Sequence, residues 1–298
     1  MFTMMNNARL TVGLQGVSVS ERAYQQALSF CNERVQGVAP GHKEAGPIIR
    51  HPDVQRMLAN MKSITEASRA LTYTACAEVD FTGGDLPTDG LDQHKRRLGL
   101  LTPIVKGWCT ETAQEVASLS LQCHGGMGYI EETGIAQIVR DARILPIYEG
   151  TNGIQAMDLV LSKIIGDKGL AINELIVDMR KSLSSLLPGS PLLISQIDRF
   201  KGSVDDLEKT VSLLLKHSTN RKFSGSVAFD VLMMTSTITA AWLMFVSVER
   251  AKLALEGNKV SSEFFDDKVA IVQYFIDSIL PRYVGHFITI SSTDTGVK

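Results

Sequence analysis

The stretch that decides the fold runs from Gln122 to Gln155 and reads QCHGGMGYIEETGIAQIVRDARILPIYEGTNGIQ. It opens with a glycine cluster, Gly125-Gly126-Met127-Gly128, and closes with Glu149, which stands between an apolar run and Gly150. Glycine permits backbone conformations that other residues avoid, and glycine clusters interrupt helices. We therefore expect this stretch to carry the functional site, and the long segments on either side of it to form the helical frame.

The composition places the chain among soluble globular proteins. It has 298 residues, of which 44% are hydrophobic and 21% are charged, enough for a large core. The net charge of −2 gives no basic footprint for nucleic acid. The four cysteines form no CxxC pair, and the first residues do not resemble a signal peptide, so we expect reduced thiols and a cytoplasmic location.

Apolar residues recur at three- and four-residue spacing on both sides of the central stretch. This periodicity predicts long helices over 3–35, 53–79, 91–123 and 151–165, with Pro103 allowing the third to be one kinked helix or two helices. Four such helices predict an all-α, up-and-down four-helix bundle over residues 1–166. Further periodic segments over 170–187, 191–216, 225–255 and 262–288 predict a second helical domain over residues 167–298.

The segment from Val231 to Val248 is uncharged over eighteen residues, which is the lower limit for a membrane span. It contains several serines and threonines, and Asp230 precedes it directly. These polar groups favour a buried core helix, so we expect no membrane span.

Glu149 is the candidate for general-base chemistry. Its neighbours Ile147 and Tyr148 suggest a dry, apolar setting, which suits a carboxylate that removes a proton from carbon. Gly150 would let a ligand approach the backbone closely. The alternative interpretation is a surface glutamate in the first turn of a helix.

The glycine cluster and several basic residues are weaker candidates. Backbone N–H groups near Gly125 and Gly126 can hold an anion or a flavin edge, but a helix C-cap and tight turn explain the same glycines. Arg9 and Arg34 lie about 37 Å apart along one predicted helix, so they cannot serve one small ligand within one chain. His51 has no second ligand at metal spacing, and we expect no metal site.

Taken together, these motifs resemble the acyl-CoA dehydrogenase family over about Asn6 to Ser162. The residues that carry the resemblance are Arg9, Glu33-Arg34, Gln122 with Gly125-Gly126-x-Gly128-Tyr129, Arg140-Asp141-Ala142 and Ile147-Tyr148-Glu149-Gly150-Thr151. The extra helical segment after Gly166 is similar to the longer members of that family, including those that act on 3-methylthiopropanoyl-CoA.

The resemblance implies FAD-dependent α,β-dehydrogenation of an acyl-CoA thioester, with Glu149 as the catalytic base. It implies contacts to FAD, several of them to the FAD of a neighbouring subunit, from Arg34, Gln36, His51, Gln122, Gly125, Gly126, Thr151 and Gly153. It implies substrate contacts from Asn6, Asn7, Arg9 and Gly150. It also implies electron-transferring flavoprotein as the electron acceptor, and a homo-oligomer, either a dimer or a tetramer.

The chain departs from the family pattern in two places. Val35-Gln36-Gly37 follows Arg34, where the family often reads Lys-Thr-Phe-Gly, and the loop from Val38 to Pro47 is altered. The N-terminal helical domain and the β-domain of the family have no counterpart here, so we expect a C-terminal fragment that is inactive in isolation. The alternative function is a helical assembly or interaction domain without catalytic activity.

Overall fold

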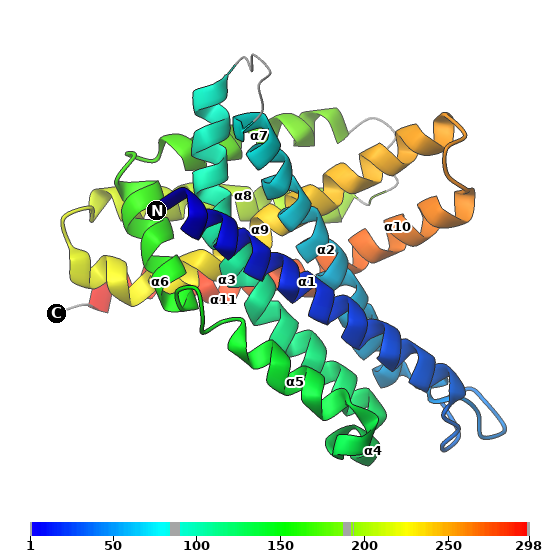
Figure 1. The fold of residues 1–298 in the computed structure, drawn as a ribbon. Helices are drawn as coiled ribbons and strands as arrows, with labels where there is room; N and C mark the ends of the chain where they lie inside the picture. The colour runs from blue at the N-terminus through cyan, green and yellow to red at the C-terminus, as the bar shows by residue number, and fades with distance from the viewer. Residues whose placement is uncertain (1, 84–89, 187–191, 193, 297–298) are drawn as a thin grey trace.

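The computed structural model describes residues 2–83, 90–186, 192 and 194–296, and Figure 1 shows them as helices joined by short connections. Two of the elements named below, η3 and η4, are π-helical, and the other η elements are short 3-10 turns. In chain order the elements are α1 (Phe2–Glu33), η1 (Ile48–Arg50), α2 (Pro52–Gly83), α3 (Leu91–His124), α4 (Gly126–Tyr129), η2 (Glu131–Thr133), α5 (Ile135–Ile144), α6 (Asn152–Met157), η3 (Asp158–Ile165), α7 (Leu170–Leu186), α8 (Ile194–Lys216), α9 (Arg221–Glu256), α10 (Ser262–Tyr274), η4 (Phe275–Ile279), η5 (Leu280–Arg282) and α11 (Tyr283–Gly296).

The all-α prediction is confirmed. Among the described residues the only β-type pairing is an isolated bridge between Val35 and Pro47. The helices α1, α2 and α3 pack against one another and supply three of the four long helices expected for the bundle (Figure 1). The fourth, α6 continued by η3, packs on α3 and also on α9. Pro103 lies inside α3, which continues through it as one helix.

The interface between α1 and α3 depends on small residues. A Cβ atom on Gly13 would lie 2.4 Å from Cγ1 of Val105, and one on Gly16 would lie 2.6 Å from the carbonyl oxygen of Cys109. Both glycines therefore allow the two helix backbones to approach more closely than larger residues would permit. This close approach fixes how α1 lies along α3.

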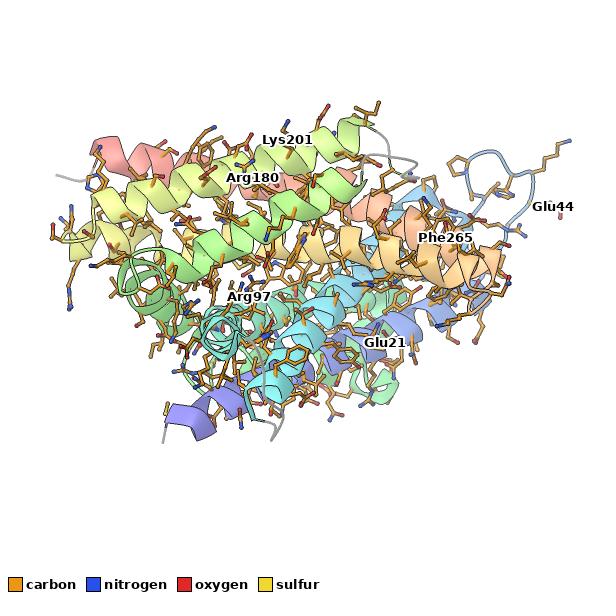
Figure 2. The ribbon with its side chains drawn as sticks, turned by 90° about the horizontal axis from the view of Figure 1, so that it is seen from above. Glu21, Glu44, Arg97, Arg180, Lys201 and Phe265 are labelled. Atoms are coloured by element: carbon orange, nitrogen blue, oxygen red, sulfur yellow. The ribbon has the colours of Figure 1, made fainter. Side chains whose placement is uncertain are left out.

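The helix α9 is the centre of the C-terminal half. Its middle is buried against helices of both halves of the chain, including α2, α3, α8 and α11. By length and composition α9 could cross a membrane, but 78% of its apolar window is buried inside the protein. Figure 2 shows the helices around it from above, with Arg180 of α7 and Lys201 of α8 on one side and Glu21 of α1 on the other.

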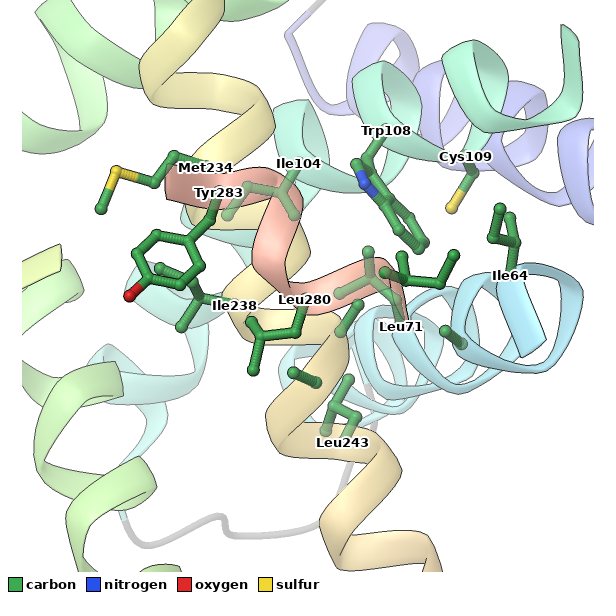
Figure 3. Packing of buried hydrophobic residues seen from close by; sticks show 14 of the residues in the cluster. Ile64, Leu71, Ile104, Trp108, Cys109, Met234, Ile238, Leu243, Leu280 and Tyr283 are labelled. Atoms are coloured by element: carbon green, nitrogen blue, oxygen red, sulfur yellow. The ribbon is translucent and has the colours of Figure 1, made fainter. Parts of the chain in front are cut away.

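One hydrophobic core runs through both halves of the chain. Figure 3 shows Trp108 of α3 and Leu71 of α2 packed with Ile238 and Leu243 of α9. The indole nitrogen of Trp108 donates a hydrogen bond to Oγ1 of Thr237 over 3.2 Å. The same apolar core contains residues from before and after residue 166. The domain boundary that the sequence predicts there therefore stays a prediction.

Candidate active site

Glu149 lies in the turn between α5 and α6. Its backbone is in the left-handed region, with φ of 54°, which is unusual for a residue with a side chain. The turn is closed by hydrogen bonds from the Tyr148 amide to the Ile144 carbonyl, 3.1 Å, and from the Asn152 amide to the Pro146 carbonyl, 3.0 Å. Such a conformation persists only where neighbouring contacts hold it, and it is typical of functional sites.

Gly150 continues the left-handed backbone, with φ of 84°. A Cβ atom there would lie 2.9 Å from Nε2 of Gln155 and 3.9 Å from Nη2 of Arg9. The same Gln155 nitrogen donates a hydrogen bond to the Gly150 carbonyl over 3.2 Å. Position 150 therefore requires glycine for two reasons: its backbone conformation is left-handed, and a side chain would have no room.

Arg9 comes from α1 and brings a positive charge to this turn. Its Nη1 lies 3.3 Å from Oδ2 of Asp158 on η3, and its Nε is buried without a hydrogen-bond partner. Asn6 is half-buried and Asn7 is exposed. Asn7 also borders a shallow, mostly apolar hollow of about 280 Å³ between α1 and α2. Arg9 therefore lies at the Gly150 turn, whereas Asn7 lies at the hollow between α1 and α2.

A buried polar cluster supports the turn from behind, and sequence reasoning missed it. Nζ of Lys106, in the middle of α3, donates to Oδ1 of Asn152 over 2.8 Å. Burial lowers the pKa of Lys106 to about 8, while Glu111 and Glu149 favour its charged form and Arg9 disfavours it. The available signal was a lone lysine within an otherwise uncharged run from Leu98 to Thr110.

A second group of predicted residues lies at the end of α1. The carbonyl of Gln36 lies 3.0 Å from Nε2 of His51, and its Oε1 accepts a hydrogen bond from Nη2 of Arg34 over 3.4 Å. The amide of Ile48 donates to the Arg34 carbonyl over 2.8 Å. The structure therefore brings Arg34, Gln36 and His51 together, and it leaves the side chains of Arg34 and Gln36 exposed.

The glycine cluster lies at the same end of the bundle. His124 stacks on Phe30 with ring centroids 4.4 Å apart, which joins the end of α3 to the end of α1. Gly125 has φ of 59°, and a Cβ atom on Gly125 or Gly126 would meet nothing within 4 Å. With Gln122 also exposed, the backbone here is open to a ligand or a second chain.

These two groups are far apart within one chain. Lys106, behind the Glu149 turn, and Gln122, beside the glycine cluster, are 16 residues apart on α3, about 24 Å at the rise of an α-helix. Thr151 and Gly153 follow Gly150 closely in the chain and therefore belong to the Glu149 group. The Thr151 hydroxyl accepts a hydrogen bond from the Ile154 amide over 3.4 Å and so caps the start of α6. One small ligand cannot contact both groups in the same chain.

The expected dry setting of Glu149 was wrong for this chain. Its side chain is exposed, and so is the side chain of Ile147 beside it. The apolar run before Glu149 is divided, since Leu145 and Pro146 face the core while Ile144 and Ile147 face outward. Among the described residues, no group of three or more His, Cys, Asp or Glu side chains is placed to hold a metal ion.

The family model described as acyl-CoA dehydrogenase, C-terminal domain, matches residues 1–162, more than half of the chain. The chain belongs to the acyl-CoA dehydrogenase family. A second model, described as acetyl-CoA dehydrogenase C-terminal like, matches residues 175–297. The family and its all-helical C-terminal fold agree with the resemblance in the sequence.

Several relatives align with nearly the whole chain, among them two that are at least 30% identical to it. The 3-methylmercaptopropionyl-CoA dehydrogenase of Ruegeria pomeroyi is 40% identical over 99% of this chain and 50% of its own length. A broad-specificity linear acyl-CoA dehydrogenase of Mycobacterium tuberculosis is 30% identical over 94% of this chain and 48% of its own length. The chain thus spans about half the length of these relatives.

A solved structure shares the fold. The acyl-CoA dehydrogenase from Bacillus anthracis, complexed with FAD, superimposes with a TM-score of 0.77 at 20% identity. The match covers 97% of this chain and 49% of that one.

Proposed function

We propose that this chain provides the catalytic base, and the helical wall behind it, in an FAD-dependent acyl-CoA dehydrogenase. The observation that carries this proposal is the conformation of Glu149, which holds a left-handed backbone in a turn closed by hydrogen bonds on both sides. A turn held in this way gives the Glu149 carboxylate a fixed point of attachment beside Gly150, and a preorganised attachment strengthens general-base catalysis.

In the proposed reaction, the Glu149 carboxylate takes the α-proton of an acyl-CoA thioester. When bound, FAD supplies a two-electron acceptor for the hydride that leaves the β-carbon, so that the thioester becomes an α,β-enoyl thioester. Gly150 has no side chain and leaves its backbone accessible beside the base. Arg9 places a positive charge beside the turn that carries Glu149 and Gly150. Asn6 and Asn7 precede Arg9 on α1.

The described residues fit a flavin cofactor in two places. Gly125 and Gly126 offer open backbone with Gln122 beside them, and the exposed Arg34 guanidinium suits a pyrophosphate. We propose that these residues, with Gln36 and His51, contact the FAD of a neighbouring subunit. Thr151 and Gly153 would then contact the FAD that serves the Glu149 of their own chain.

This arrangement requires a homo-oligomer, and exposed apolar side chains support one. Tyr129 is 79% exposed, and Met127, Ile147 and Ile154 are also exposed. Met127 and Tyr129 lie at the glycine cluster, and Ile147 and Ile154 lie at the Glu149 turn, so each of the two regions presents exposed apolar side chains of the kind found at protein–protein contacts. Electron-transferring flavoprotein as acceptor and a cytoplasmic location are further parts of the proposal. Membership of a dehydrogenase family favours an enzyme over an inactive assembly domain.

The test is anaerobic flavin reduction by an acyl-CoA, in an FAD-loaded enzyme that contains this chain. Glu149→Gln should slow the reduction by about 10²–10⁴-fold or more with little change in KM, because the amide cannot accept the proton. Glu132→Gln, a second exposed glutamate in the same stretch, is the matched control and should reduce the flavin at the parent rate. Bleaching at the parent rate by Glu149→Gln would place the base elsewhere.

A further inference from the structure

Lys106 is a lysine without any exposed surface, in the middle of α3. Its ammonium is held by the 2.8 Å hydrogen bond to Oδ1 of Asn152. Burying an ammonium group costs stability, even where a hydrogen bond offsets part of that cost. A methionine would fill similar space without this cost, so the charge itself needs an explanation beyond packing.

Asn152 connects Lys106 to the turn that carries Glu149. Its Nδ2 lies within donor distance of the Gly107 carbonyl, the Thr110 hydroxyl and Oε1 of Glu111, at 3.2, 2.9 and 2.9 Å. Its backbone amide donates to the Pro146 carbonyl over 3.0 Å, and this bond closes the turn. Asn152 is buried, and both ends of its side chain are held by α3. A buried hydrogen-bond network that joins two elements in this way restricts their conformation.

Charged groups from three elements act electrostatically on the ammonium. Glu111 comes from α3 itself, Arg9 comes from α1, and Glu149 comes from the turn. Arg9 is in turn paired with Asp158 of η3. The two carboxylates favour the charged lysine and Arg9 opposes it, so the charge of Lys106 is coupled to the charge of the proposed base.

We propose that Lys106 is a positioning residue for the base: through Asn152 it holds the turn that presents Glu149, and the charges of its ammonium and of the Glu149 carboxylate interact. The consequence for catalysis rests on the proposed function of Glu149. Two parts of the proposal concern this chain alone: Lys106 restrains the Glu149 turn, and the charges of Lys106 and Glu149 are coupled. Both can be measured without substrate or flavin.

The first experiment measures amide hydrogen exchange in the 298-residue chain. Lys106→Met should speed exchange at Asn152 and Gln155 by about tenfold or more, the effect expected from losing one charge-assisted hydrogen bond. The melting temperature should stay the same or rise, because a buried charge is replaced by an apolar side chain. Lys163→Met, at a partly buried lysine of η3, is the matched control and should leave both amides unchanged.

A second measurement keeps Lys106 in place. Glu149→Gln removes a carboxylate that favours the charged ammonium, so the pKa of Lys106, followed by NMR of its side chain, should fall below that in the parent and in Glu132→Gln. This measurement tests the coupling even if Lys106→Met does not fold. Unchanged exchange in a folded Lys106→Met chain, or an unchanged Lys106 titration in Glu149→Gln, would overturn the proposal.

The catalytic consequence is tested in the FAD-loaded enzyme. Lys106→Met should lower kcat by about 100-fold with KM nearly unchanged, the usual effect of a misplaced reacting group. The loss of activity on the alkaline side, where Lys106 gives up its proton near pH 8, should disappear in the variant. Parent-like kcat in Lys106→Met together with an inactive Glu149→Gln would overturn the positioning role. Faster exchange together with a fully active Glu149→Gln would instead reject Glu149 as the base.

Discussion

Gly16 of α1 lies so close to Cys109 of α3 that a Cβ atom on Gly16 would be 2.6 Å from the Cys109 carbonyl oxygen. The neighbouring atom is backbone, so no side-chain rotation can make room for a methyl group. This contact holds α1, which carries Arg9 near its start, in fixed register with α3, which carries Lys106. The relative position of the two charges therefore depends on a glycine that touches neither of them.

Gly16→Ala should lower the free energy of unfolding by about 1–3 kcal/mol, since the two helices must move apart to admit the methyl group. Gly202→Ala on α8 is the matched control, because a Cβ atom there would meet nothing within 4 Å. The control should raise the free energy of unfolding by up to about 1 kcal/mol through helix propensity. Urea unfolding curves measure both values. Equal stabilisation by the two substitutions would show that α1 and α3 are not in contact at Gly16.

The stability of the chain should depend on pH through Lys106. Because its pKa in the folded state is lowered from 10.5 to about 8, the unfolded state binds this proton more tightly. The resulting destabilisation is fully present below pH 8 and is relieved as the pH rises from about 8 to 10.5. At roughly 1.4 kcal/mol per pH unit, the parent should gain about 3 kcal/mol relative to Lys106→Met across this range.

The comparison with Lys106→Met is necessary because other groups titrate at high pH. Burial raises the pKa of the Cys109 thiol to about 12, which makes the folded state less stable as the pH rises from about 9. That contribution is the same in both chains and cancels in the difference. A difference that stays constant from pH 7 to pH 10.5 would mean that Lys106 titrates normally.

The helices could be predicted from sequence because each buries a regular stripe of side chains. In α2, for example, Met57, Met61, Ile64 and Leu71 are all buried. The segment 262–288 was predicted as one helix, but the structure divides it into α10, η4, η5 and α11. Pro281 explains part of this division, since proline lacks the N–H group that a continuous helix needs.

The Glu149 motif could also be found in the sequence, but its support could not. Lys106 and Asn152 are 46 residues apart, and no local pattern pairs them. Within α3, a lysine in an apolar run is as consistent with an exposed helix face as with a buried charge. The left-handed backbone of Glu149 could not be predicted from the sequence either. Glycine is the residue that usually adopts this conformation, so the sequence points to Gly150 and not to Glu149.

A chain that ends at Gly166 should be unstable, because its core continues into α9. A Cβ atom on Gly107 would lie 2.6 Å from Cδ2 of Leu232, and Trp108 packs on α9 from the same part of α3. Without residues 167–298 this buried apolar surface meets water. We expect residues 1–166 alone to bind the dye ANS strongly or to aggregate, while the 298-residue chain does neither. A soluble, cooperatively folding 1–166 with weak dye binding would instead confirm an independent domain.

Gly150→Ala should test how tightly the turn at Glu149 is built. Both Gly150 and Gly41 have left-handed backbones, with φ of 84° and 83°, so alanine at either position carries a similar backbone cost of about 1–2 kcal/mol. A Cβ atom on Gly41 would meet nothing within 4 Å, whereas one on Gly150 would lie 2.9 Å from Nε2 of Gln155. Gly41→Ala therefore measures the backbone cost alone.

The additional loss in Gly150→Ala then reports the contact with Gln155, and we expect it to be about 1–3 kcal/mol beyond the control. Because Gln155 donates to the Gly150 carbonyl, its displacement should also speed amide exchange at Gln155 itself. Chemical denaturation of the two variants measures the first effect, and hydrogen exchange measures the second. Equal losses in the two variants, with unchanged exchange at Gln155, would mean that this side chain moves aside freely and that the turn is not held from the α6 side.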